Sequence, residues 1–168
     1  MPEPVPIPGS ARARLINAAI DHFERDGYEQ ASVVAIAEEA GVTTGSLYHH
    51  FGSKQGLYLV IREEMERRMT ERMEGAIAAV GRGRPGIQAA LEVTFDAALR
   101  FEVARILAEP KPDDGTDPIA AQLEASTGNE VAAGCLAAAW RSALLAVASG
   151  VEPETARSGL LWVLEPSG

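Results

Sequence analysis

Apolar residues recur every three to four positions near the start of the chain, which places them on one face of a helix. The first such stretch covers residues 11–26 and ends before Gly27, a residue type that commonly follows the last turn of a helix. Ser32 then stands where it can cap a second stretch, residues 33–40, which Gly41 ends. The pattern predicts two short helices with tight turns.

The same spacing continues through a third and a fourth helix. Thr43 can cap a short helix that runs to about Phe51, because Leu47 and Phe51 would share its inner face. Ser53 can cap the fourth helix, whose apolar positions continue to a glycine-rich break at residues 81–86. Three short helices followed by a long one are therefore expected.

Helical spacing also dominates the rest of the chain, and no strand pattern competes with it. The expected helices cover residues 87–99, 101–109, 119–127, 130–149 and 153–164. At Arg100 one bent helix would fit as well as two. The sequence predicts an all-α fold.

Composition places the chain among ordinary globular proteins. Of its 168 residues, 46% are hydrophobic and 23% charged, which is enough apolar mass for a core. The single cysteine, Cys135, excludes an intramolecular disulfide, fits a reducing interior and is expected to be buried. Residues 1–10 lack the features of a signal peptide, and no uninterrupted apolar run is long enough to span a membrane. We expect a cytoplasmic protein without a membrane partner.

Charge disfavours one class of nucleic-acid binder. The formal net charge is -9, and residues 1–54 hold four basic side chains against seven acidic ones. The basic residues are Arg12, Arg14, Arg25 and Lys54, and the acidic ones are Glu3, Asp21, Glu24, Asp26, Glu29, Glu38 and Glu39. Cationic side chains supply most of the affinity of a nonspecific DNA coat, so this balance argues against one. DNA binding, if present, must rest on local geometry.

The most specific pattern in the chain is AEEAGVTTGSLYHHFGSK, residues 37–54. It resembles the TetR (tetracycline-repressor) family, whose pattern is an Ile-Ala pair, Ala-Gly-Val, a Ser or Thr, then Gly-x-Leu-Tyr-x-x-Phe-x-Ser-Lys. The match runs from Ile36 to Lys54 and extends upstream to Gly27, Tyr28 and Phe23. The resemblance covers about the first third of the chain.

The resemblance implies a homodimeric transcription regulator with three parts. Residues 1–10 would form a flexible N-terminal arm, and residues 11–54 a three-helix, helix-turn-helix DNA-binding domain. Residues 55–168 would form a helical domain for ligand binding and dimerisation, joined to the head by the long fourth helix. Family members differ widely in this second domain, so the resemblance identifies no ligand, and the domain is short for the family.

The residue types of the motif suit DNA recognition for physical reasons. Gly41 permits a left-handed turn between two helices, and Val42 fills the corner between them. Thr43 caps the third helix, whose N-terminus carries partial positive charge and can approach a phosphate. Gly45 removes a side chain near the helix start, so the backbone can come close to DNA.

The third helix is expected to read bases with the face opposite Leu47 and Phe51. Thr44, Ser46 and His49 carry short or planar hydrogen-bonding groups on or near that face. Such groups suit the major groove, where the pattern of donors and acceptors differs for all four base pairs. We expect these three residues to determine sequence preference.

Other residues of the head are expected to contact phosphates. The resemblance implies contacts from the Tyr48 hydroxyl and from Lys54, and Ser32 could make a third. The alternatives are a half-buried aromatic at Tyr48, a solvated charge at Lys54 and a simple cap at Ser32. His50 is expected to be structural or flanking. Val34 departs from the family, which often has a polar or basic residue there.

Large apolar residues of the body are candidates for a ligand pocket. Met65 and Met69, with Met73, form an i, i+4 stripe, for which core packing is the favoured alternative. The other candidates are Phe95, Leu99, Phe101, Val103 and Trp140. A pocket built from these side chains would prefer an apolar or aromatic compound.

Two stretches near the C-terminus predict a subunit interface. Residues 130–149 are dominated by alanine, and residues 159–164 add Trp162. Small residues permit close helix approach, so two copies could form a four-helix arrangement as in the family. An intramolecular core is the alternative.

Patterns for other chemistry are missing. Residues 81–86 lack the Gly-Lys-Ser/Thr end of a phosphate loop, and a calcium loop starting at Asp113 would have Pro118 where glycine is required. His49 and His50 lie about 100° apart on a helix and do not converge on a metal. We expect no enzyme, no cofactor and no metal site.

The favoured hypothesis is a ligand-responsive transcriptional regulator, acting as a repressor. It would bind a palindromic double-stranded operator as a homodimer and be released by a small molecule. The alternative hypothesis is a helical dimer that binds a small molecule or a protein and has no operator affinity. The acidic head and Val34 favour that alternative.

Overall fold

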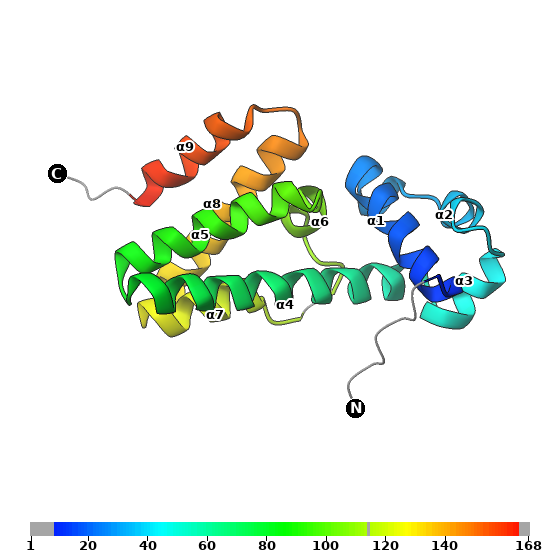
Figure 1. The fold of residues 1–168 in the computed structure, drawn as a ribbon, viewed down its shortest axis with the longest axis horizontal. Coiled ribbons are helices and arrows are strands. Elements are labelled where there is room, and N and C mark those ends of the chain that lie inside the picture. Colours follow the sequence, from blue (N-terminus) through cyan, green and yellow to red (C-terminus); the bar gives the residue numbers. More distant parts are fainter. Residues whose placement is uncertain (1–8, 114, 165–168) are drawn as a thin grey trace. The chain divides into compact units, whose positions relative to one another are not determined.

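The computed structural model describes residues 9–113 and 115–164 (Figure 1). Within these ranges the chain consists of helices and connecting segments, without a strand. The helices are α1 (Ala11–Gln30), α2 (Val33–Glu39), α3 (Thr44–Phe51), α4 (Lys54–Val80), α5 (Arg84–Arg100), α6 (Ala104–Ala108), α7 (Pro118–Thr127), α8 (Glu130–Ala148) and α9 (Pro153–Leu164). The expected all-α fold is confirmed. Residues 1–8 of the expected N-terminal arm lie outside the described residues.

The chain divides into two compact units, Met1–Arg62 and Glu63–Gly168. We refer to them as the head and the body. Helix α4 begins in the head and ends in the body. The assignment of DNA binding to residues 11–54 and of ligand binding to residues 55–168 stays a prediction.

Side-chain caps define the short helices of the head. Ser10, Ser32 and Thr43 each accept a hydrogen bond from the backbone N–H three residues later, at 3.2, 3.4 and 3.2 Å. Such bonds satisfy N–H groups that a helix start leaves unpaired. Gly27 has φ 79° and ψ 165°, so the helical path of α1 is interrupted where the sequence predicts its end.

An apolar core joins α1, α2, α3 and the first turns of α4. Its buried members are Leu15, Ala19, Phe23, Ile36, Leu47, Leu57, Tyr58 and Ile61. The Tyr58 ring meets the Phe23 ring edge-on, with centroids 5.0 Å apart, and lies 4.8 Å from the Tyr28 ring. These favourable aromatic contacts fix the first turns of α4 against α1.

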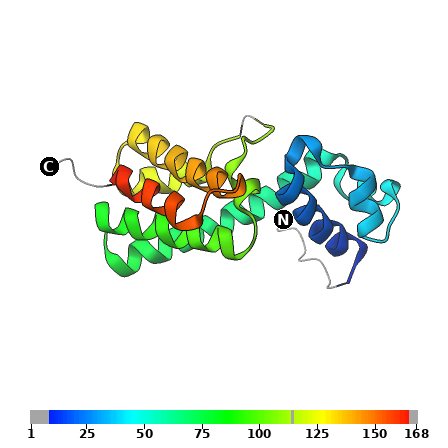
Figure 2. The ribbon, with the colours of Figure 1, turned by 90° about the horizontal axis from the view of Figure 1, so that it is seen from above.

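The body is a bundle in which α8 packs against α5, α6, α7 and α9, and α9 runs beside α8 in both views (Figures 1 and 2). Its buried side chains include Leu91, Phe95, Ile106, Leu107, Ile119, Leu123, Trp140 and Leu144. Burial of each large apolar side chain contributes about 1.5–3 kcal/mol. The periodicity read from the sequence therefore yields a packed helical body.

The break between α4 and α5 is shorter than the sequence predicts. Helix α5 begins at Arg84, so part of the expected linker, residues 81–86, is helical. Gly86 is buried in the first turn, where an added Cβ would come 1.9 Å from the Gly81 carbonyl oxygen. Glycine at this position therefore serves close packing.

The prediction that Cys135 is buried is wrong, because its side chain is exposed on α8. The inner face of α8 is formed by Ala133, Ala137 and Trp140. Cys135 is two positions from Ala133, about 200° around the helix, and so faces the opposite way. Because α8 is apolar on several sides, its composition alone does not identify the inner face.

Candidate nucleic-acid interface

The turn between α2 and α3 has the geometry that the motif predicts. Gly41 has φ 64°, in the left-handed region that glycine adopts without strain. Its N–H donates to the Glu38 carbonyl at 3.0 Å, and the N–H of Val42 donates to the Ala37 carbonyl at 3.0 Å. These bonds end α2 and direct the chain into α3.

Helix α3 has a buried side and an exposed side. Leu47 is fully buried, whereas Tyr48 is 51% exposed and both His49 and His50 are exposed. Thr44 and Ser46 are half-buried near the helix start, and Gly45 is exposed. The predicted base-reading residues therefore lie on α3 with polar groups at least partly accessible to solvent, and their contact with bases stays a prediction.

The fold does not require glycine at position 45. An added Cβ would lie 3.6 Å from Thr43 Oγ1, which is an ordinary contact, and the φ of Gly45 is not positive. By contrast, a Cβ at Gly56 would come 2.1 Å from the Phe51 carbonyl oxygen. Packing explains Gly56, whereas nothing in the fold explains Gly45.

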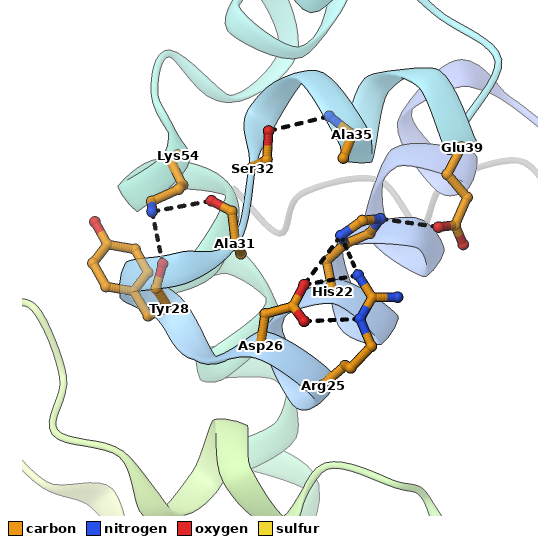
Figure 3. A network of polar contacts seen from close by, with 9 residues as sticks. All are labelled: His22, Arg25, Asp26, Tyr28, Ala31, Ser32, Ala35, Glu39 and Lys54. Carbon is orange, nitrogen blue, oxygen red and sulfur yellow. Dashed lines mark hydrogen bonds and ion pairs between the residues drawn. The ribbon is translucent and has the colours of Figure 1, made fainter.

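Lys54 has a structural role that the sequence did not reveal. Its ammonium donates hydrogen bonds to the backbone carbonyls of Tyr28, Glu29 and Ala31, at 2.7, 3.0 and 3.2 Å. Figure 3 shows the bonds to Tyr28 and Ala31. The ammonium also lies 4.8 Å from the centre of the Tyr28 ring. Any phosphate contact by Lys54 would have to compete with these three bonds.

A second polar network, centred on His22, joins α1 to α2 (Figure 3). The His22 ring is buried; its Nε2 lies 2.9 Å from Glu39 Oε2, and its Nδ1 lies 2.9 Å from Arg25 Nη2. Because Arg25 only donates, the neutral ring with its proton on Nε2 fits both contacts. Hydrogen bonding to Arg25 lowers the pKa of Asp26 below its ordinary value.

Two further arginines of α1 support α2 and α3. Arg14 Nε donates to the Ala40 carbonyl at 2.8 Å, at the end of α2, and Arg14 Nη1 donates to the Gly9 carbonyl at 2.7 Å. The Arg12 guanidinium lies 5.3 Å from the centre of the Phe51 ring on α3. Sequence spacing gave no signal for the contacts with Ala40 and Phe51, because they join residues 26 or more positions apart.

The candidate pocket residues of the body have mixed exposure. Met65, Met69, Phe95, Val103 and Trp140 are buried, and Leu99 is half-buried. Phe101 is 45% exposed, and the Arg72 guanidinium lies 5.1 Å from the centre of its ring. Phe101 is thus set apart from the buried candidates, and binding of a ligand by the others stays a prediction.

The body also contains a buried ionic cluster that the sequence analysis missed. Glu66 of α4 is 1% exposed, and its carboxylate oxygens lie 3.6 Å from Lys111 Nζ and 3.6 Å from Arg141 Nη2. Arg141 also pairs with Asp117 at 2.6 Å and donates to the Leu107 carbonyl. The cluster therefore connects α4, α6, α8 and the segment before α7.

Apolar side chains remain exposed on α8 and α9. Val131 is 76% exposed and Trp162 is 74% exposed, and Leu145 and Val163 are also on the surface. Only 28% of the apolar stretch of α8 is buried within one chain. By length and composition, α8 is the sole helix of the described residues that could cross a membrane. The same described ranges contain no group of three His, Cys, Asp or Glu residues positioned to hold a metal ion.

Comparison with known proteins relates the head to one family. Residues 15–61 match the family model "Bacterial regulatory proteins, tetR family". The HTH-type transcriptional repressor AcnR of Corynebacterium glutamicum is 35% identical over 77 residues, which is 45% of this chain and 41% of AcnR. An uncharacterised HTH-type transcriptional regulator of Mycobacterium tuberculosis is 34% identical over 84 residues, 50% of this chain and 43% of that protein. The matched segments thus span less than half of each relative.

Solved structures extend the likeness to the whole fold. A TetR-family transcriptional regulator from Pectobacterium atrosepticum superposes with a TM-score of 0.67 at 22% identity, covering 90% of this chain and 89% of that one. A TetR-like regulator from Rhodococcus sp. RHA1 gives a TM-score of 0.68 at 23% identity, covering 96% of both chains. The head thus matches the TetR family model, and the fold of the chain is similar to that of TetR-family regulators.

Proposed function

We propose that this protein is a transcriptional regulator that binds double-stranded operator DNA through α3. The observation that carries the proposal is the exposed side of α3, which presents Tyr48, His49 and His50 while Leu47 anchors the helix in the core. A short helix of this kind, held by a preceding helix and a tight turn, can enter the major groove. The curated relatives are named as regulators, and AcnR as a repressor. We infer a repressor here as well.

The residues of the head divide into base readers and phosphate contacts. Thr44, Ser46 and His49 read base edges, and the bare backbone at Gly45 lets α3 approach the groove closely. Tyr48 contacts phosphate through its hydroxyl. Two further donors are the hydroxyls of Ser32 and Thr43, which keep their hydrogens available while they accept the capping bonds.

Lys54 has a different part in this proposal. Its three bonds to the end of α1 hold α4 to the head, so we assign it a positioning role instead of the phosphate contact expected from the sequence. Movement of α4 in the body would then be transmitted to the head. A small molecule, apolar or aromatic in character, would bind among the buried residues of the body and shift α4.

We further propose that the protein acts as a homodimer in the cytoplasm. The exposed apolar side chains of α8 and α9 supply a surface whose burial in a second copy would stabilise the pair. A two-fold dimer presents two copies of α3, which requires a palindromic operator. Its half-sites would be about one helical turn apart or somewhat more.

A second candidate is a helical dimer without operator affinity. It is favoured by Val34, which is exposed on α2, and by the excess of acidic side chains in the head. This candidate predicts that the body binds its ligand or partner normally while the head ignores DNA.

Selection of bound sequences from a random duplex pool tests the proposal. We expect enrichment of one palindromic sequence, and a Thr44→Ala variant should select a sequence that differs at the same position of each half-site. A compound screen for release of the selected duplex then tests the effector. Failure to enrich any duplex would support the second candidate.

A further inference from the structure

The four cationic side chains of residues 1–54 are all engaged in contacts within the protein. Lys54 donates to three carbonyls, and Arg14 donates to the carbonyls of Ala40 and Gly9. Arg25 donates to both carboxylate oxygens of Asp26, at 2.8 and 2.7 Å (Figure 3). The Arg12 guanidinium lies over the Phe51 ring. Direct phosphate contacts by these groups would compete with these contacts within the protein.

The two exposed imidazoles of α3 are placed differently. The rings of His49 and His50 lie with centroids 5.4 Å apart, and within the described part of the chain neither is in a hydrogen bond or an ion pair. Both follow the first turn of α3, on the side of the helix that is exposed to solvent. They are therefore available to bind a phosphate or a base edge.

Charged groups of the neighbouring helices set the environment of these imidazoles. The charged or titratable residues on α1, α2 and the first turns of α4 are Arg12, Arg14, Asp21, His22, Glu24, Arg25, Asp26, Tyr28, Glu29, Glu38, Glu39, Lys54 and Tyr58. Arg12 contacts α3 through Phe51, whose ring lies 6.1 Å from the His50 ring. Glu39 is bound to His22, and Glu38 is exposed on α2. Within the described residues, neither imidazole pairs with a carboxylate.

We propose that operator binding is coupled to proton uptake by His49 and His50, whose imidazolium forms supply positive charge at the DNA surface. This inference rests on the proposed function. A phosphate beside His50, or a hydrogen-bond acceptor on the base edge that His49 reads, favours the charged form of the imidazole, so protons are taken up on binding. By linkage, affinity rises as the pH falls, and each proton taken up changes the association constant by up to about tenfold per pH unit.

The proposal predicts a joint dependence on pH and salt. Each phosphate neutralised by a cation makes the log-log salt slope more negative by about 0.9. At about pH 8.5, where ordinary imidazoles are neutral, the slope should be shallow, and at about pH 6 it should steepen by about one unit per imidazolium contact. A pH effect that acted only through folding would not change the salt slope in this way.

The experiment measures binding of the full-length protein to the duplex recovered by selection, using fluorescence anisotropy from about pH 6 to about pH 8.5 at two salt concentrations. We expect affinity to increase by at least about tenfold toward low pH for the native chain. The double variant His49→Gln/His50→Gln should bind weakly with little pH dependence. A His49→Lys/His50→Lys variant should keep a steep salt slope at both ends of the range.

His22 provides the control, because it is the one histidine of the sequence besides His49 and His50. It is buried between α1 and α2, so His22→Gln should keep the pH dependence of binding, with circular dichroism reporting the folded fraction. The proposal would be overturned if the pH dependence of binding were lost in His22→Gln and kept in the His49→Gln/His50→Gln variant. Native binding with a flat pH profile and a salt slope that does not change with pH would also overturn it. Absence of binding at every pH would instead contradict the proposed function itself.

Discussion

Gly45 offers a test that separates the fold from DNA binding. Replacement by alanine adds a methyl group at a position where the nearest neighbour, Thr43 Oγ1, lies at an ordinary distance of 3.6 Å. Alanine stabilises a helix interior over glycine by about 0.8–1 kcal/mol, and the gain is smaller at the second residue of α3. We expect Gly45→Ala to leave the head as stable as before, or more stable by about 0.5 kcal/mol.

DNA binding should respond in the opposite direction. If the α3 backbone approaches the groove at Gly45, the methyl group must displace DNA or α3, and we expect affinity to fall by at least about tenfold, or about 1.4 kcal/mol. Gly75→Ala is the matched control. Gly75 lies on α4 with open space around its added Cβ, so this variant should gain stability and bind DNA normally.

Two measurements on each variant decide the outcome. The three tyrosines lie in the head and both tryptophans lie in the body, so tyrosine and tryptophan fluorescence report urea unfolding of the two units separately. Anisotropy with the selected duplex reports binding. Unchanged affinity for Gly45→Ala would refute close approach of α3 at this position, and a large loss of head stability would refute the packing argument.

The remaining predictions address positioning, recognition, assembly and acid stability. Lys54→Met should destabilise the head by about 1.5–3 kcal/mol in tyrosine-detected unfolding, because the three carbonyls lose their charged hydrogen-bond donor. The same variant should leave the salt slope of DNA binding unchanged. A shallower slope without loss of stability would instead mark Lys54 as a phosphate contact. Base discrimination at a particular operator position should fall by about 1–3 kcal/mol in each of the variants Thr44→Ala, Ser46→Ala and His49→Ala. Tyr48→Phe should instead weaken binding to all sequences alike. Competition with duplexes altered at single positions distinguishes the two results. Trp162→Asp should shift the protein toward monomer in sedimentation without unfolding it, because the side chain is exposed in a single chain; an unchanged dimer would exclude this part of α9 from the interface. Because Arg25 lowers the pKa of Asp26, the contribution of Asp26 to stability is present above the ordinary aspartate value of about 3.9 and is lost as the pH falls through the lowered pKa. The stability difference between native protein and Asp26→Asn should therefore shrink in acid, and a constant difference would contradict this assignment.

Local signals explain why most helices could be predicted from the sequence. Ser32 and Thr43 cap the helices that they were expected to cap, and Gly41 has the expected left-handed conformation. Leu47 is buried as its spacing predicts. Each of these features depends on residues within a few positions of one another, which is the range over which periodicity and capping operate.

Contacts between distant residues could not be predicted in this way. The Lys54 ammonium reaches carbonyls 23 or more positions earlier in the chain. The two cations that pair with Glu66, Lys111 and Arg141, come from separate segments far from it in the sequence. The inner face of α8 could not be predicted either. Apolar residues lie on several sides of this helix, so their spacing does not indicate whether Cys135 is buried or exposed. At these sites tertiary packing decides which group meets which.

The central claim, that α3 is the surface that binds DNA, is tested most directly by nuclear magnetic resonance. Addition of the selected duplex to uniformly ¹⁵N-labelled protein should shift the amide signals of Thr43, Thr44, Gly45 and their neighbours on α3 more strongly than those of the body. An unrelated duplex of the same length should produce smaller shifts. Shifts concentrated in α5 to α9, or equal responses to both duplexes, would contradict recognition by α3.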